Sequence, residues 1–182
     1  MLVHINPSAL DIDVELIYAT PDNLTGAPIY RTPLCLLHAD AANRLERAAG
    51  LARGIGLRLR IYDAFRPVEA QWKLWHALPD PDYVADPRIG SNHSRGVAVD
   101  LTLVDGGGRP LDMGTGFDEM TERSHHARID LDAEQQRNRA LLLGIMTAAG
   151  WEHYRTEWWH YQLPNTKDYP LMTDTAVGGR MM

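Results

Sequence analysis

Two short segments of this chain contain the side chains that a hydrolytic metal site requires. The first contains His93 and Asp100, and the second contains Glu157 and His160. Imidazole and carboxylate groups are ligands of zinc, and a catalytic zinc site keeps one coordination position free for water. Three of the four side chains could hold one divalent ion, and the fourth could manage the protons of the water. The residue types therefore predict metal-assisted hydrolysis.

The separation of His93 and Asp100 requires a bend in the backbone. An extended strand rises about 3.3 Å per residue, so seven residues would span roughly 23 Å, whereas two ligands of one zinc ion lie about 3–3.5 Å apart. Gly96 is expected to form the bend, because glycine adopts positive φ angles at little steric cost. Residues 97–104 alternate as a strand, which places Asp100 beside Ala98 on the less hydrophobic face, where a ligand can approach.

The second segment also reads as a strand. Residues 158–163 are rich in aromatic side chains, which favour strands. In a regular strand His160 shares a face with Trp158 and Gln162, whereas Glu157 points the opposite way. Glu157 must then lie at the start of the strand, where the backbone is free to turn. That position suits a general base better than a metal ligand.

Two motifs and three further segments of the chain together match a known family. The first motif is Ser-x-His-x-x-Gly-x-Ala-x-Asp over residues 91–100, and the second is Glu-Trp-Trp-His over residues 157–160. The further segments lie at residues 18–26, 63–67 and 112–118. In this order they resemble the zinc D,D-peptidase family (peptidase family M15), and within it the D-alanyl-D-alanine dipeptidases. The resemblance covers nearly the whole chain.

The resemblance implies a role for each matching residue around the metal. The ligands of a single Zn²⁺ ion would be His93, Asp100 and His160. Glu157 matches the catalytic base and acid. Arg66 matches the arginine that stabilises the oxyanion of the reaction, and Asp63 matches a residue that supports this arginine.

Four more residues match positions at which such enzymes contact the two ends of a dipeptide. Asp118 is the natural partner for the substrate ammonium group, because it carries a carboxylate. Ser91 could donate to the substrate carboxylate through its hydroxyl group. Tyr18 and Tyr30 are the other two expected contacts. A pocket closed at both ends in this way would exclude longer peptides.

Each implied residue also has an ordinary structural interpretation. Arg66 precedes Pro67, a residue typical of the first turn of a helix, so its guanidinium could form a salt bridge there. Asp118 could cap a helix that begins at Glu119. Glu157 could be a surface acid, Asp63 a turn residue and Ser91 a loop residue. Tyr18 and Tyr30 could be aromatic residues of the core. No metal is expected at the remaining histidines, which are His4, His38, His76, His125, His126 and His153.

The function expected from this resemblance is zinc-dependent hydrolysis of D-alanyl-D-alanine to two D-alanines by an activated water. No covalent intermediate is needed, so Cys35 is not required as a nucleophile. One alternative is a D,D-carboxypeptidase or peptidoglycan endopeptidase of the same family. A second is a noncatalytic zinc-binding interaction module, which the presence of Glu157 and Arg66 disfavours. Salvage of D-alanine and glycopeptide resistance would use identical chemistry, so both settings stay open.

The surrounding sequence predicts an α+β fold. Helices are expected over residues 39–51, 67–77 and 132–148, and a strand over 57–62 delivers Arg66 just beyond its end. Residues 78–89 form a loop, and residues 105–108 form a turn. Because helices and strands do not alternate regularly, we expect a central, mainly antiparallel sheet with flanking helices. By resemblance, its core is that of the zinc D,D-peptidases and hedgehog-like proteins.

Length and composition are those of one globular domain. The 182 residues fit a single domain over 1–182, with residues 172–182 as a loose tail. A net charge of -6 disfavours nucleic-acid and anionic-membrane partners. One cysteine, no secretory signal pattern and no apolar span predict a cytoplasmic location. The expected partner is a small dipeptide, and the sequence does not determine the oligomeric state.

Overall fold

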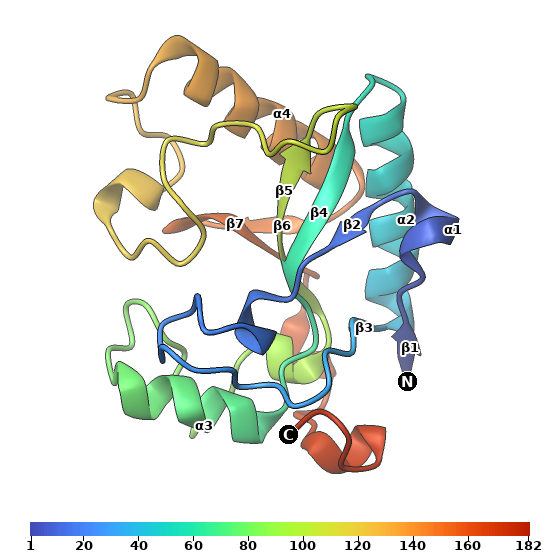
Figure 1. Cartoon of the computed structure of the whole chain (residues 1–182), viewed down its shortest axis with the longest axis vertical. Coiled ribbons are helices and arrows are strands. Elements are labelled where there is room, and N and C mark those ends of the chain that lie inside the picture. The colour runs from blue at the N-terminus through green and yellow to red at the C-terminus, as the bar shows by residue number, and fades with distance from the viewer.

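A five-stranded sheet forms the centre of the computed structural model, which describes all residues 1–182 (Figure 1). Its strand order is β2-β4-β5-β7-β6. In that order the strands are β2 (Asp13–Val14), β4 (Arg58–Asp63), β5 (Ala98–Val104), β7 (Glu157–Gln162) and β6 (Glu152–Tyr154). Only the β2–β4 pairing is parallel, and the other three are antiparallel. The expected α+β fold with a mainly antiparallel sheet is confirmed.

Four α-helices and a second, two-stranded sheet surround this centre. The helices are α1 (Pro7–Leu10), α2 (Ala39–Arg53), α3 (Val68–Ala77) and α4 (Ala133–Ala148). The small sheet pairs β1 (Leu2–His4) with β3 (Leu36–His38). Short 3₁₀ helices lie at Ile17–Ala19, His93–Arg95, Glu122–Ser124, Thr166–Asp168 and Asp174–Val177. The three helices predicted from the sequence are present, with ends that shift by one or two residues.

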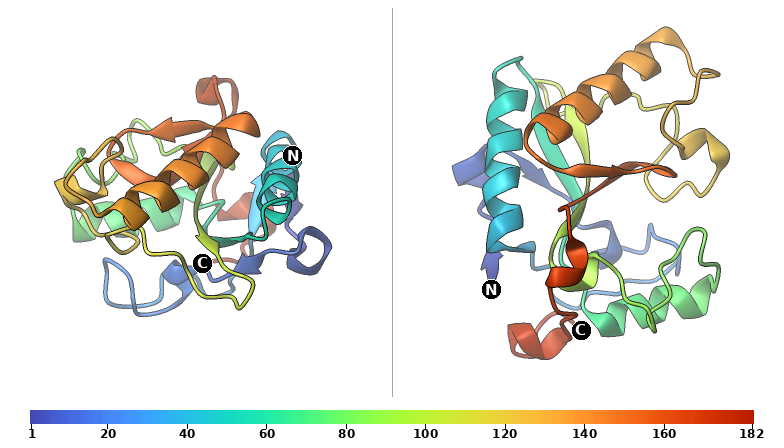
Figure 2. Two further views of the ribbon diagram at one scale, coloured as in Figure 1. Left: turned by 90° about the horizontal axis from the view of Figure 1, so that it is seen from above. Right: turned by 180° about the vertical axis from the view of Figure 1, so that it is seen from behind.

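Helices α2 and α4 pack on the central sheet and on each other (Figure 2). The buried stripe of α2 consists of Ala41, Leu45, Ala48, Ala49 and Ala52, which is the spacing of one helical face. Asp132 caps the start of α4 by accepting hydrogen bonds from Glu134 N and Gln135 N. Such a cap contributes about 1 kcal/mol, and burial of a leucine such as Leu45 contributes roughly 1.5–3 kcal/mol.

The central strand β5 is buried along its whole length. Val99, Leu101 and Leu103 belong to the main hydrophobic core. Asp100 and Thr102 alternate with them and point to the opposite face, as the sequence predicts. A carboxylate is thereby held in the interior, where it requires polar partners.

The expectation of a loose tail over residues 172–182 is wrong. Val177 and Met181 are buried in a second hydrophobic cluster against α3. Met172 N donates to Ser94 O at 2.8 Å, and Met172 O accepts from Val68 N at 3.1 Å. The segment is ordered because its few apolar side chains cover an apolar surface of α3. That surface forms only in the folded chain, so the sequence does not reveal it.

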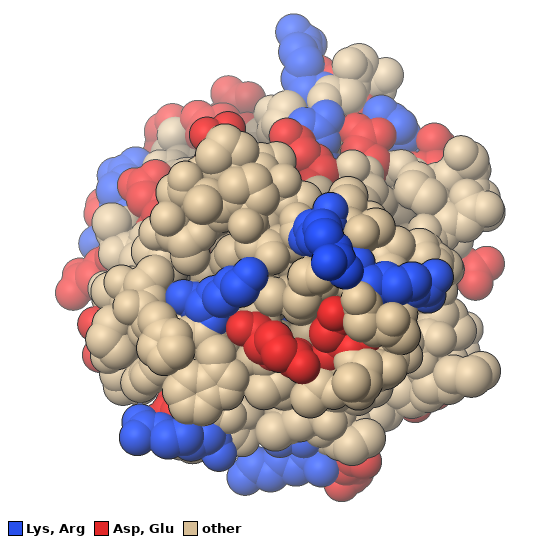
Figure 3. All heavy atoms as spheres, turned by 60° about the horizontal axis from the view of Figure 1, so that its bottom comes forward, with Lys and Arg blue, Asp and Glu red and all other residues tan.

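On the face shown in Figure 3, basic and acidic side chains are interspersed, and no broad area of one sign is present. None of the helices combines the length and the hydrophobicity needed to cross a lipid bilayer.

Candidate metal centre

The chain folds back between His93 and Asp100 as the spacing requires. His93 begins the 3₁₀ helix His93–Arg95, whose C-cap is Gly96 with a left-handed φ of 68°. A Cβ atom at Gly96 would also lie 2.6 Å from the Leu2 side chain, so both conformation and space favour glycine. Strand β5 then starts at Ala98 and presents Asp100 directly opposite His160 of β7. Residues paired across antiparallel strands point to the same face, which explains why these two ligands meet.

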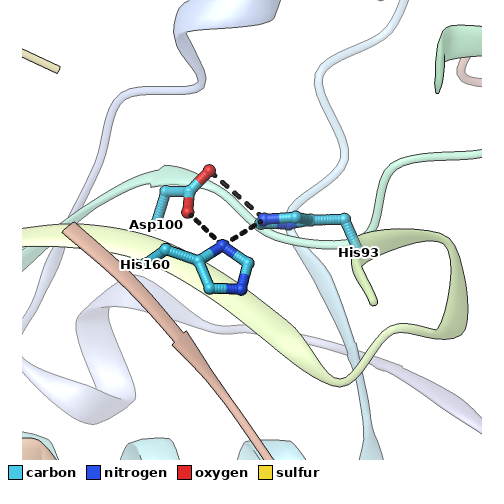
Figure 4. A group of neighbouring side chains, drawn as sticks. All are labelled: His93, Asp100 and His160. Carbon is cyan, nitrogen blue, oxygen red and sulfur yellow. Dashed lines mark hydrogen bonds and ion pairs between the residues drawn. The ribbon is translucent and has the colours of Figure 1, made fainter. Parts of the chain in front are cut away.

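The three predicted ligands converge (Figure 4). His160 Nδ1 lies 3.1 Å from His93 Nε2 and 3.1 Å from Asp100 Oδ1. His93 Nε2 lies 3.3 Å from Asp100 Oδ2. All three side chains are buried, and their candidate ligand atoms lie within 4.8 Å of one another. These separations match the roughly 3–3.5 Å edges of a tetrahedral zinc site.

The other ring nitrogens of the two histidines have protein partners. His93 Nδ1 donates to Ala64 O at 2.8 Å, which leaves Nε2 free to bind a metal. His160 Nε2 lies 3.2 Å from Gln162 Oε1, and this oxygen also accepts from Asn92 Nδ2 at 2.7 Å. Such outer partners fix the tautomer and the orientation of metal-binding histidines. The donor set and its surroundings therefore fit a zinc ion.

Glu157 lies at the start of β7, as predicted, and faces the same cavity as His160. Its Oε2 is 3.8 Å from His160 Nδ1. Burial raises the pKa of this carboxyl group to about 7. The group is therefore poised to gain and lose a proton near neutral pH.

The pairing of β7 is irregular at Glu157. A register shift in the β6–β7 pairing follows His153, after which Tyr154 pairs with Glu157. A strand irregularity of this kind redirects side chains locally, so Glu157 can face the cavity that His160 also lines. Trp159 lines this cavity as well, whereas the indole of Trp158 donates to Thr115 Oγ1 at 2.8 Å.

Arg66 lies next to the candidate metal ligands, just beyond the end of β4. Its Nε donates to Asp63 Oδ2 at 2.9 Å, and its Nη1 donates to Gln71 Oε1 at 3.0 Å. Nη2 is 3.6 Å from Asp100 Oδ2, and the guanidinium carbon lies 4.7 Å from the centre of the Tyr18 ring. Arg66 therefore forms a buried salt bridge, as its structural interpretation predicts. It also lies beside the candidate metal centre, as its catalytic interpretation predicts.

The two tyrosines occupy different positions. Tyr18 lines the cavity and donates to Asp118 Oδ2 at 2.7 Å. Tyr30 donates to Asp63 Oδ1 at 2.8 Å and is not among the residues that line the cavity. The expectation that Tyr30 contacts substrate is therefore not supported by its position, because its hydroxyl group is used to hold Asp63.

Asp118 and Ser91 both face the cavity. Asp118 has a φ of 58° and does not cap a helix, since the nearest 3₁₀ helix begins at Glu122. Burial raises the pKa of Asp118 to about 7. The Ser91 hydroxyl oxygen accepts from His93 N at 3.2 Å, so this residue also shapes the turn that presents the histidine.

The cavity has a volume of about 270 Å³ and contains the candidate metal ligands, Glu157 and Arg66. This is slightly below the roughly 300–1,000 Å³ typical of small-molecule sites, which suits a small substrate. Sequence reasoning missed Gln71 and Gln162, which hold Arg66 and His160 respectively. No motif marks either glutamine, because both act through contacts formed only in the folded chain.

Comparison with known proteins gives a consistent result. The family model described as D-Ala-D-Ala dipeptidase, of peptidase family M15, matches residues 2–176. A D-alanyl-D-alanine dipeptidase of Escherichia coli K12 is 52% identical over 164 residues, which cover 90% of this chain and 85% of the relative. One from Enterococcus faecium is 36% identical over 181 residues, with 85% and 90% coverage. One from Streptomyces coelicolor is 34% identical over 181 residues, also with 85% and 90% coverage.

Proposed function

Because this chain belongs to the D-Ala-D-Ala dipeptidase family of M15 metallopeptidases, we propose that it hydrolyses D-alanyl-D-alanine to two D-alanines, with zinc as its metal. One observation supports this above all others. Three buried ligand atoms converge beside Glu157 and Arg66 in a cavity of about 270 Å³. That is the complement of groups needed to hydrolyse an amide bond in a small molecule.

His93, Asp100 and His160 would hold the zinc ion. When bound, zinc supplies a Lewis acid and lowers the pKa of a coordinated water toward neutrality. The chain supplies the remaining functions. The carbonyl oxygen of Ala64 and the Gln162 side chain hold the two imidazole rings in place, so the ligands need little rearrangement.

Glu157 is the proposed general base and acid. It accepts the proton of the attacking water and then delivers this proton to the nitrogen of the leaving D-alanine. A pKa of about 7, caused by burial, suits both steps at neutral pH. A single carboxyl group therefore serves both halves of the reaction, and no covalent intermediate forms.

Arg66 is proposed to stabilise the negative charge that develops on the scissile carbonyl oxygen. Asp63 and Gln71 hold the guanidinium group from two sides, so the donors are oriented before the reaction starts. One such preorganised donor contributes about 3–4 kcal/mol to catalysis.

Asp118 is proposed to bind the substrate ammonium group, and Ser91 to bind the substrate carboxylate. Asp118 faces the cavity, and its other partner is the Tyr18 hydroxyl group. A neighbouring ammonium group favours the ionised form of a carboxyl group whose pKa burial has raised to about 7. Recognition of both termini would restrict the enzyme to free dipeptides.

The test is hydrolysis by the zinc-loaded protein of D-Ala-D-Ala, D-Ala-L-Ala and N-acetyl-D-Ala-D-Ala. Cleavage of free dipeptides alone supports the proposal. Cleavage of the acylated compound alone would indicate a D,D-carboxypeptidase, and no turnover with zinc bound would indicate a binding module. The control is Glu157→Gln, which should retain zinc while kcat falls about 10²–10⁴-fold.

A further inference from the structure

One wall of the cavity is a loop that packs against α3 through the buried Val84 and has few hydrogen bonds to the rest of the molecule. Most residues between Pro81 and Gly90 line the cavity. The backbone bonds of this loop are internal, in turns that start at Asp80 and Asp86. A single hydrogen bond joins residues 79–90 to the remainder of the chain, from Gln71 Nε2 to Ala85 O at 2.7 Å.

The same glutamine also holds Arg66. Gln71 is 1% exposed, and its Oε1 accepts from Arg66 Nη1 at 3.0 Å. A guanidinium group only donates and a backbone carbonyl only accepts. The amide therefore has one workable orientation, with its oxygen toward Arg66 and its nitrogen toward Ala85. Both ends of the side chain are used, and neither contact can be made by the flipped amide.

We infer that Gln71 is a positioning residue that couples the cavity wall to the guanidinium group of Arg66. The inference rests on the proposed role of Arg66 in the hydrolysis. When the loop sits against a substrate of the right size, Gln71 holds the guanidinium in line with the scissile carbonyl. A larger substrate would displace the loop, and the displacement would reach Arg66 through this one amide. Substrate size would then affect kcat as well as KM.

The first test is Gln71→Met in the full-length, zinc-loaded protein. Methionine keeps the length and bulk of the side chain and removes both hydrogen bonds. We expect kcat for D-Ala-D-Ala to fall about tenfold, the change that follows from about 1.4 kcal/mol. Hydrogen–deuterium exchange of the amides of residues 79–90 should become several-fold faster, while zinc content stays unchanged. A kcat within twofold of the wild-type value would overturn the inference.

A second variant separates the two contacts and still gives a result if methionine prevents folding. In Gln71→Glu the carboxylate, kept ionised by Arg66, can still accept from the guanidinium but cannot donate to Ala85 O. We expect exchange at residues 79–90 to rise as in the methionine variant, with kcat within about threefold of wild type. Unchanged exchange in this variant would overturn the coupling.

A matched control comes from α4. Gln136 also donates to a loop carbonyl, Leu131 O, at 2.7 Å, and Leu131 does not line the cavity. Gln136→Met should leave kcat and the exchange of residues 79–90 unchanged. Failure of the proposed function gives a different result. A wild-type protein that is inactive on every dipeptide would overturn that function, whereas the exchange measurements would still test the contact between Gln71 and the loop.

Discussion

The candidate metal ligands and the cavity-facing Asp118 are held in two different ways. Asp100 and His160 are paired across β5 and β7, inside a ladder of backbone hydrogen bonds. Asp118 instead lies in the long connection between β5 and α4, which contains no regular element beyond one 3₁₀ turn. Strands fix side chains to within a narrow range, whereas a loop depends on the few contacts that tie it down.

The contacts of the Asp118 loop come mainly from one helix. Arg139 of α4 donates to Met113 O at 2.6 Å and to His125 O at 3.0 Å. Asn138 donates to Asp112 O at 2.8 Å. The difference teaches that the sheet itself fixes the candidate metal ligands, whereas the proposed recognition residue Asp118 depends on side chains of α4 that do not line the cavity.

The largest effect should follow from removing a ligand in the sheet. Asp100→Asn keeps the shape of the side chain and removes its negative charge. We expect zinc to be lost and kcat/KM to fall by at least about 10³-fold, more than the roughly 10–100-fold loss that removal of an outer partner causes. Metal analysis of the purified protein and steady-state kinetics measure the two quantities.

Asp105→Asn is the matched control for this change, since Asp105 lies in the exposed turn just after β5. It should bind zinc as the wild type does. Full zinc occupancy in Asp100→Asn would show that the sheet does not hold the metal as described.

A change in the loop should affect binding of the dipeptide and leave the metal in place. In Asp118→Asn the Tyr18 hydroxyl group keeps an acceptor, but the substrate ammonium group loses its charged partner. We expect KM for D-Ala-D-Ala to rise about 30-fold, as for the loss of a buried charge pair of roughly 2 kcal/mol, with zinc content unchanged. An unaltered KM would remove Asp118 from the recognition site.

A smaller effect should arise from the helix that holds the loop. Arg139→Met removes the hydrogen bonds to the loop carbonyl groups while keeping the aliphatic stem. We expect the free energy of unfolding to fall by about 1–3 kcal/mol and KM to rise about fivefold, without loss of zinc. Urea denaturation and kinetics provide the measurements. Arg137→Met, at an exposed position on the same helix, should change neither quantity, and equal effects of both variants would argue against a specific role.

The smallest effect concerns His126, which lies in the connection between β5 and α4 and contacts β6 and β7. Burial lowers the pKa of His126 from 6.5 to about 4, and its Nε2 has no partner. The unfolded chain binds a proton near pH 6.5 and the folded chain only near pH 4. The unfolding free energy should therefore decrease as the pH falls through this window, by about 1 kcal/mol after allowance for partial exposure.

His126→Phe keeps a ring against His153 and Tyr161 and should flatten this pH dependence. Unfolding free energies from urea titrations at several pH values between 4 and 7 test the point. An identical slope in the variant would place the titrating group elsewhere.

Much of the chemistry can be predicted from the sequence because it depends on short-range patterns. The spacing of His93, Gly96 and Asp100 requires a turn followed by a strand, and the structure contains both. Strand alternation places Asp100 and Thr102 away from the core. These features follow from backbone geometry within about ten residues, and a linear pattern determines such geometry.

Other features are decided only by tertiary structure. The register shift between β6 and β7 lets Glu157 face the cavity together with His160. Packing against α3 orders the C-terminal segment. Gln71 gains its two partners only when α3, the end of β4 and the cavity loop come together. Each outcome depends on residues far apart in the chain, whose mutual positions follow from the burial of a shared core and leave no local pattern in the sequence.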